Sequence, residues 1–221
     1  MKAVCLLSGG MDSSTLAYVA KDMGYDIIAL YFAYGQRTEE KERACARTIA
    51  RMLDAAEFVE IGLEHFKAIG ASSLTDIEIP VEEYTGEVED VPGTYVPFRN
   101  ANLLAIATSL AEARRAEAIF IAVQAVDYPG YPDCRPEFIE AFQRVIDLGT
   151  AADPRITLKT PFVRMAKADI LRIGFALGVP YAATWSCYQR SDRACGVCSS
   201  CHHRREAFRM LGVLDPIEYE E

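Results

Sequence analysis

Short apolar runs alternate along the chain with longer segments in which apolar residues recur at helical spacing. The runs have the length of strands, and the periodic segments have the spacing of one buried helix face. Strands are predicted at 3–7, 26–32, 57–61, 118–123 and 156–158, and helices at 16–23, 39–53, 99–114, 136–148, 166–177 and 200–211. This alternation predicts a doubly wound α/β fold, with a parallel sheet, right-handed crossovers and flanking helices.

Two stretches depart from the alternation and divide the chain. The pattern predicts one α/β domain over 1–180 and a small cysteine-bearing segment over 181–221 that packs on it. An acidic stretch at 62–95 interrupts the domain and ends in Pro92-Gly93. We interpret it as a solvated surface insertion, and the alternative is a lid or a subunit contact beside the site.

Composition and charge narrow the class of protein. The 221 residues are 51% hydrophobic and 25% charged, which is ordinary for a globular domain. The net charge of −9 argues against non-specific binding to a nucleic-acid backbone, which needs a basic face. The sequence has neither an apolar run of membrane-spanning length nor a charged leader before its first strand. We therefore expect a cytoplasmic protein.

The stretch Ser-Gly-Gly-Met-Asp-Ser-Ser at 8–14 joins the first strand to the first helix. Its glycines allow a tight turn and a close approach of an anion to backbone N–H groups. The first helical turn adds unpaired N–H groups and a positive dipole end, and Ser8, Ser13 and Ser14 add hydroxyl donors. Asp12 is expected to cap the helix and can hold a cation. The pattern predicts a phosphate cradle of neither the G-x-x-x-x-G-K-[ST] nor the G-x-G-x-x-G type, and an ordinary capped turn is the alternative.

Several polar segments are expected to lie beside this loop. Ligands of open parallel sheets bind beyond the carboxyl ends of the strands, which places 8–14, 34–37, the surroundings of Arg99 and 127–135 on one rim. Arg99 and Lys167 each open a predicted helix, where a cation opposes the helix dipole. An anionic partner or ligand would explain both positions, and a surface-directed side chain is the alternative for Arg99.

The loop at 124–135 combines aromatic, acidic and basic side chains. Its members Asp127, Tyr131, Asp133 and Arg135 suit a flat, purine-like heterocycle that carries amino and carboxylate groups. Cys134 has no histidine near it in sequence, so we interpret it as a packing residue and not as a nucleophile.

Four of the seven cysteines cluster near the C-terminus in a C-x7-C-x2-C-x2-C pattern, at Cys187, Cys195, Cys198 and Cys201. In a reducing compartment such clustering indicates a metal site and not disulfides. Four thiolates can surround one Zn²⁺ and leave no position for water, which predicts a structural site. An iron–sulfur cluster is the alternative; zinc is favoured because the ferredoxin follow-on cysteine is missing.

The motifs resemble a known family. The 8–13 loop resembles the pyrophosphate-binding loop of the adenine-nucleotide α-hydrolase-like (PP-loop) superfamily, whose enzymes split ATP between its α- and β-phosphates. The 7-cyano-7-deazaguanine synthase family of the queuosine pathway is similar to this chain over about 1–213, through Tyr-Gly-Gln-Arg (34–37), Val-Pro-Phe-Arg-Asn (96–100), 125–138, Thr-Trp-Ser-Cys-Tyr (184–188) and 195–201. Two departures stand out: that family usually has Gly where Phe98 stands and His where Thr38 stands.

The resemblance implies a Rossmann-like PP-loop fold and an ATP-dependent carbon–nitrogen ligase. It implies conversion of 7-carboxy-7-deazaguanine and ammonia into 7-cyano-7-deazaguanine, through an activated carboxylate and then an activated amide. Asp12, Arg99 and Lys167 would be catalytic, with Mg²⁺ accompanying ATP at Asp12 and one structural Zn²⁺ at the cysteines. Arg99, Asp127, Tyr131, Asp133 and Arg135 would bind the deazaguanine. The ATP-binding residues would be Ser8, Gly9, Gly10, Met11, Asp12, Ser13, Ser14, Thr15, Leu16, Ala17 and Tyr18.

Two other functions are alternatives at this point. One is an ATP-dependent enzyme that adenylates a tRNA base directly, against which the net charge of −9 argues. The other is a non-catalytic nucleotide sensor, in which the polar loop at 127–135 would have no purpose. The expected partners are small molecules, with no direct nucleic acid and no membrane, and a homodimer is expected.

Overall fold

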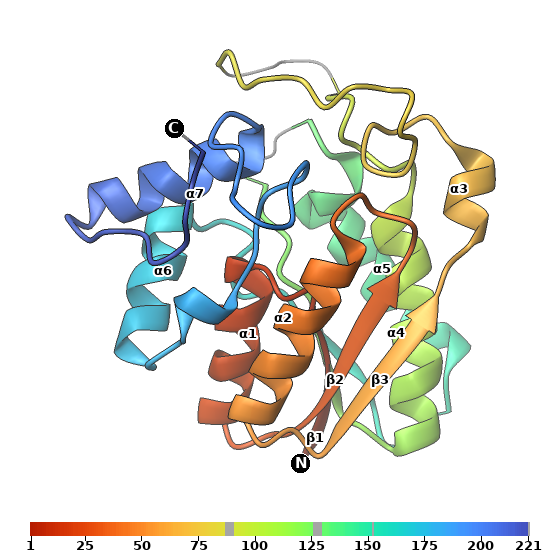
Figure 1. Ribbon diagram of the computed structural model, residues 1–221. Helices are drawn as coiled ribbons and strands as arrows, with labels where there is room; N and C mark the ends of the chain where they lie inside the picture. Colours follow the sequence, from red (N-terminus) through yellow and green to blue (C-terminus); the bar gives the residue numbers. More distant parts are fainter. Residues whose placement is uncertain (87–90, 126–129, 152, 221) are drawn as a thin grey trace.

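Figure 1 shows a computed structural model of the chain, which describes residues 1–86, 91–125, 130–151 and 153–220. Strands and helices follow the predicted alternation. The strands are β1 (Lys2–Leu6), β2 (Asp26–Ala33), β3 (Glu57–Gly62), β4 (Ala118–Phe120) and β5 (Thr157–Lys159). The helices are α1 (Met11–Asp22), α2 (Glu39–Met52), α3 (His65–Ile69), α4 (Arg99–Arg114), α5 (Pro136–Gly149), α6 (Lys167–Ala176) and α7 (Ser199–Met210), with 3₁₀ turns η1 (Pro132–Cys134) and η2 (Tyr181–Ala183).

The described strands form one parallel sheet in the order β3-β2-β1-β4-β5, which confirms the predicted doubly wound topology. Strands β2 and β3 follow β1 on one side, and β4 and β5 follow on its other side, so the strand order reverses between β1 and β4. At such a switch point the connections leave neighbouring strands toward opposite faces, and a crevice opens beyond their carboxyl ends. The serine-rich loop after β1 and the segment after β4 both border that crevice.

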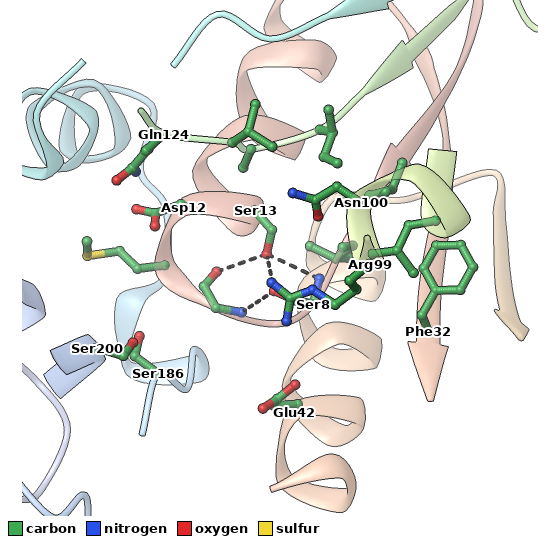
Figure 2. A pocket seen from close by; sticks show the side chains of 18 of the residues that line it. Ser8, Asp12, Ser13, Phe32, Glu42, Arg99, Asn100, Gln124, Ser186 and Ser200 are labelled. Atoms are coloured by element: carbon green, nitrogen blue, oxygen red, sulfur yellow. Dashed lines mark hydrogen bonds between the residues drawn. The ribbon is translucent and has the colours of Figure 1, made fainter. Parts of the chain in front are cut away.

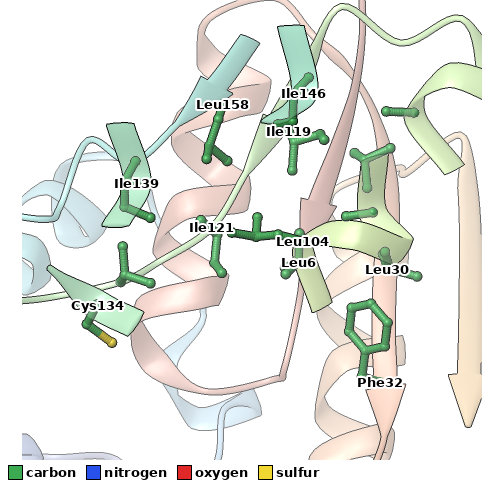
Figure 3. Close-up of a cluster of buried hydrophobic side chains, with 14 of the residues drawn as sticks. Leu6, Leu30, Phe32, Leu104, Ile119, Ile121, Cys134, Ile139, Ile146 and Leu158 are labelled. Atoms are coloured by element: carbon green, nitrogen blue, oxygen red, sulfur yellow. The ribbon is translucent and has the colours of Figure 1, made fainter. Parts of the chain in front are cut away.

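Each face of the sheet carries its own apolar layer, which explains the continuous apolar run in β2. Alternate residues of β1 point to opposite faces, Val4 into one layer and Cys5 into the other. Leu104 of α4 and Ile139 of α5 cover the first face, as Figure 3 shows. Helices α1, α2 and α6 cover the second face through Leu16, Ile49 and Ile170. Burial on both faces is the usual environment of a parallel sheet.

Two local predictions need correction. Helix α1 begins at Met11 with Gly10 as its N-cap, so the prediction that Asp12 caps the helix is wrong. Asp12 instead lies in the first turn, where its carboxylate complements the helix dipole. Strand β4 covers only Ala118–Phe120 and not 118–123, because its neighbour β5 pairs with it no further than Lys159.

The C-terminal segment packs on the sheet domain through α7. Phe208 of α7 belongs to an apolar cluster with Leu171 of α6 and Tyr181. The fully buried Arg204 forms an ion pair with Asp215, with 2.8 Å between Nε and Oδ2, and so fixes the chain beyond α7. None of the helices within the described residues has the length and apolar character needed to cross a membrane.

Part of the 62–95 stretch lies against the cysteine segment. Glu83 forms an isolated antiparallel bridge with Cys198, and the Tyr84 amide donates to the Val197 carbonyl at 2.9 Å. Arg37 holds another part, because its Nε donates to the Ser73 carbonyl at 2.7 Å. The stretch is thus attached at two places near the carboxyl ends of the strands.

Candidate functional site

Gly9 fixes how the loop after β1 approaches α2. Its φ of 79° lies in the left-handed region, which favours glycine. A Cβ at this position would lie 2.5 Å from the Glu42 carbonyl oxygen and 2.7 Å from the Ala46 nitrogen. Both atoms belong to the backbone of α2 and have no freedom to move aside. The loop conformation and its packing on α2 therefore both require glycine.

The serines of the loop bond to one another and hold its shape. The Ser8 and Ser13 hydroxyls lie 2.9 Å apart, and the Ser13 hydroxyl also accepts from the Ser8 amide at 3.2 Å. The Gly10 amide donates to the Ser8 hydroxyl at 3.3 Å, and Figure 2 shows this network at the start of α1. Ser14 Oγ is buried and has no hydrogen-bond partner in the part of the chain that is described. The arrangement presents hydroxyls and first-turn amides to the crevice, as an anion site requires.

The cation that opens α6 has an acidic partner within the protein. Lys167 Nζ lies 2.7 Å from Oδ2 of Asp12, in the first turn of α1. Lys167 is buried, and the second Asp12 oxygen, Oδ1, is buried without a hydrogen-bond partner among the described residues. This pairing agrees with the expectation that a cation at a helix start needs an anion. It also leaves one Asp12 oxygen available to a ligand or a cation.

Arg99 enters the site from the first turn of α4. The residue before it, Phe98, has a φ of 56°, the left-handed conformation that glycine adopts most easily. The Arg99 Nη1 donates to the Tyr34 hydroxyl at 3.0 Å. The Asn100 amide donates to Asp133 Oδ2 at 2.8 Å, so a carboxylate complements the start of the same helix. The departure at Phe98 therefore keeps a glycine-like backbone.

Thr38 connects the site to the cysteine segment. Its hydroxyl donates to Glu42 Oε1 at 2.7 Å and lies 3.2 Å from the Cys187 carbonyl oxygen. Burial raises the pKa of the Glu42 carboxyl, and hydrogen bonds from Thr38 and Gln36 oppose that rise. A threonine at this position thus donates a hydrogen bond to Glu42 without an imidazole.

One cavity of about 250 Å³ is lined by residues of the serine-rich loop, by the Asp12–Lys167 pair, by Arg99 and by Glu42 (Figure 2). Among the predicted site residues, the cavity brings together Ser8, Gly10, Met11, Asp12, Ser13, Arg99, Tyr131 and Lys167. Its wall also contains residues for which the sequence predicted no role of their own, among them Glu42, Asn100, Gln124, Trp185 and Tyr188. Glu42 belongs to a run of acids that is typical of an exposed first helical turn, and Gln124 belongs to no recognisable motif.

Other predicted site residues lie elsewhere. Asp133 is buried and directs its carboxylate to the backbone of α4, and Arg135 is exposed at the start of α5. Neither lines the cavity. Asp127 lies outside the described residues. Of the four side chains predicted in this loop, Tyr131 is therefore the one that the described cavity contains.

The four C-terminal cysteines form a buried cluster. Their Sγ atoms all lie within 4.8 Å of one another, and those of Cys195 and Cys201 are 3.9 Å apart. Thiolates bound tetrahedrally to one zinc-sized ion are about 3.8 Å apart, so the spacing fits. The Arg190 and Cys195 amides each lie 3.3 Å from the Cys187 sulfur and stabilise its thiolate form. Hydrogen bonds from Cys198 and Cys201 hold the pKa of the Cys187 thiol far below its usual range. The cluster can hold a metal ion.

The serine loop at the switch point of a parallel sheet, with Asp12, Lys167 and Arg99 around it, defines an α/β protein of the PP-loop type. Comparison with family models narrows the class. The model described as "Queuosine biosynthesis protein QueC" matches residues 2–212, and the chain belongs to this family.

Individual relatives agree with this membership. The chain is 80% identical over 219 residues to the 7-cyano-7-deazaguanine synthase of Methanoculleus marisnigri, covering 99% of both proteins. It is 65% identical over 219 residues to the enzyme of the same name from Methanospirillum hungatei, covering 99% of this chain and 100% of the relative. A solved 4-thiouridine synthetase–RNA complex with bound ATP has a TM-score of 0.53 at 18% identity, covering 96% of this chain and 50% of that one. This last likeness concerns the fold.

Proposed function

We propose that the chain is an ATP-dependent ligase that converts 7-carboxy-7-deazaguanine and ammonia into 7-cyano-7-deazaguanine. Family membership and the names of the relatives support the reaction. The observation that carries the proposal is the shared cavity, in which the serine loop, the Asp12–Lys167 pair and Arg99 surround one space. An acidic substrate and ATP are both anions, and such a site can bring them together and compensate their charge.

In the proposed first step, a carboxylate oxygen attacks the α-phosphorus of ATP, and pyrophosphate leaves. Ammonia then attacks the acyl carbon, and the nucleotide leaves with the former carboxylate oxygen while one proton is released. In the second step the amide oxygen attacks another ATP, and pyrophosphate leaves again. Loss of the nucleotide and of two protons from nitrogen forms the nitrile. No side-chain nucleophile is required.

The chain's own groups have distinct parts in this proposal. The amides and hydroxyls of the serine loop hold the pyrophosphate portion, which is the geometry that P-loop-like anion sites use. Arg99 and Lys167 compensate charge that develops during both attacks. The unpaired Asp12 Oδ1 is the group that would meet Mg²⁺ accompanying ATP, because Mg²⁺ prefers carboxylate and phosphate oxygens. Tyr131 contacts the heterocycle from the cavity wall, and Asp127, Asp133 and Arg135 stay predictions for its recognition.

The proposal includes one structural Zn²⁺ at Cys187, Cys195, Cys198 and Cys201. The buried all-sulfur donor set supports it, since such sets leave no open position for catalysis. Zinc would hold the C-terminal segment, whose carbonyl at Cys187 contacts Thr38 beside the cavity. A cytoplasmic location, where thiols stay reduced, and a homodimer are part of the proposal.

Mass spectrometry of the products tests the reaction. The purified protein is incubated with ATP, 7-carboxy-7-deazaguanine and ammonium, and the expected product is one water lighter than the corresponding amide. ATP consumption should require both the acid and ammonium. Without a nitrile product the proposal fails, and binding of unmodified tRNA at physiological salt would favour direct modification of RNA instead.

A further inference from the structure

Gln124 is a buried carboxamide with no assigned partner. Its side chain is 2% exposed, and both Oε1 and Nε2 are without hydrogen-bond partners among the described residues. Buried amide groups are almost always hydrogen-bonded, because leaving one unpaired costs free energy. Gln124 also lines the cavity of the serine loop. An unpaired donor and acceptor on that wall indicate that a ligand completes them.

The pairing of β4 with β1 places Gln124 beside the serine-rich loop that follows β1. Phe120 of β4 pairs with Cys5 of β1, and Gln124 follows Phe120 by the same number of residues as Gly9 follows Cys5. Both segments therefore leave neighbouring strands at the same edge of the sheet, and both line the same cavity. The next residue is fixed, since the Ala125 amide donates to the Val163 carbonyl at 2.9 Å. In Figure 2 Gln124 lies on the side of the cavity where Asp12 lies, across from Arg99.

Each charged side chain on this side of the cavity can either donate or accept hydrogen bonds, but not both. The Lys167 ammonium can only donate, and an ionised Asp12 carboxylate can only accept. The proposed substrate changes its needs during the reaction, because its acyl group is first a carboxylate that accepts and then an amide that also donates. A glutamine carboxamide can do both, because its NH₂ group donates and its carbonyl oxygen accepts hydrogen bonds.

We infer that Gln124 orients the acyl group of the substrate in both halves of the reaction. Its Nε2 donates to the carboxylate oxygen that does not attack ATP. Its Oε1 later accepts an N–H of the amide, which turns the amide oxygen toward the second ATP and keeps the amide nitrogen away from it. This inference rests on the proposed function.

Two variants separate the donor from the acceptor. Gln124→Glu keeps acceptors, loses the donor and adds negative charge, so it should impair the step that starts from the anionic acid more than the step that starts from the neutral amide. Gln124→Met keeps the length of the side chain and removes both the hydrogen-bond donor and the acceptor, so it should impair both steps. The matched control is Gln143→Met, since Gln143 belongs to α5, bonds to Asp147 and to the Leu158 amide of β5, and does not line the cavity.

The experiment measures kcat/KM separately for the acid with ammonium and for the synthetic amide, each with ATP. For Gln124→Glu we expect the ratio of the two values to shift by about tenfold or more against the acid, which is the loss expected when one hydrogen bond to a charged group is removed. Gln124→Met should lower both values by about tenfold without lowering the melting temperature, because it removes an unpaired buried amide. Gln143→Met should leave the ratio unchanged.

The outcomes are distinguishable. Wild-type values for both substrates in Gln124→Met overturn the inference alone, as does an equal loss for both substrates in Gln124→Glu. A lower melting temperature of Gln124→Met with an unchanged kcat/KM indicates a structural residue and also overturns it. A wild-type protein that consumes neither acid nor amide overturns the proposed function, and the inference with it.

Discussion

The ammonium of Lys167 lies 2.7 Å from the carboxylate of Asp12, although 155 positions separate the two residues along the chain. The pair joins the first turn of α6 to the first turn of α1 at the edge of the serine-rich loop that follows β1. One Asp12 oxygen accepts from lysine, and the other is buried without a partner among the described residues. The pair thus sets the position of a carboxylate and a cation where ATP is proposed to bind.

Replacing Lys167 by methionine should therefore affect both turnover and stability. Loss of the cation should lower turnover by about a hundredfold or more, because charge that develops in the transition state loses its compensation. It should also lower the free energy of unfolding by about 2–3 kcal/mol, since Asp12 is left partly buried without its partner. Steady-state kinetics and urea unfolding measure the two effects.

Arg172→Met is the matched control for this change. Arg172 lies on the same helix and pairs with Asp169, but the two side chains are 67% and 50% exposed, so its loss should cost no more than about 0.5 kcal/mol. Combining Lys167→Met with Asp12→Asn should restore part of the stability and none of the turnover. Wild-type turnover in Lys167→Met would contradict a role for this cation.

Substituting Gly9 by alanine should disrupt the serine-rich loop after β1. The new Cβ would meet the backbone of α2, and the left-handed φ adds strain, so we expect a loss of about 3 kcal/mol in the free energy of unfolding. Gly24→Ala separates the two causes, because Gly24 has a φ of 85° and nothing within 4 Å of its would-be Cβ. Gly24→Ala should cost only about 1 kcal/mol and leave turnover unchanged. Equal losses in the two variants would show that contact with α2 does not matter.

Sequence patterns predicted the parallel sheet, the turn from β1 into α1 and the clustering of four cysteines, because each depends on local spacing. Phosphate binding by the serine-rich loop stays a prediction. The partner of Lys167 could not be predicted, since only the docking of α6 on α1 brings Asp12 to it. Gln124 opens the loop at 124–135 that the sequence singled out, but no role was predicted for it, because its place beside the cavity follows from the pairing of β4 with β1 and not from any motif. Asp133 looked like a ligand group in sequence, yet the start of α4 uses its carboxylate.

Removal of the proposed zinc ion should unfold the C-terminal segment. Cys195→Ser should lower the metal content well below one equivalent per chain, because a hydroxyl is a poor substitute for a thiolate ligand. Turnover should fall with it, since the Thr38 hydroxyl donates to Glu42 in the cavity wall and also contacts the Cys187 carbonyl.

Elemental analysis and absorbance identify the metal. A colourless protein with one zinc would agree with the proposal, whereas a brown protein with visible absorbance would indicate an iron–sulfur cluster. Cys5→Ala is the control, because Cys5 is buried in β1 outside the cluster and should keep the full metal content.

Phe98 offers a test of how the backbone before Arg99 is held. Its φ of 56° suits glycine and is most unfavourable for a β-branched side chain. Its ring is exposed and packs edge-on against Phe138, so little buried area is lost on truncation. Phe98→Gly should therefore keep turnover and change the free energy of unfolding by less than about 1 kcal/mol. Phe98→Val should lower it by about 1–2 kcal/mol more than Phe98→Gly does and should raise the KM for the acid, because α4 begins at the displaced Arg99. If both variants behave alike in unfolding and in KM, the left-handed conformation at this position has no part in placing Arg99.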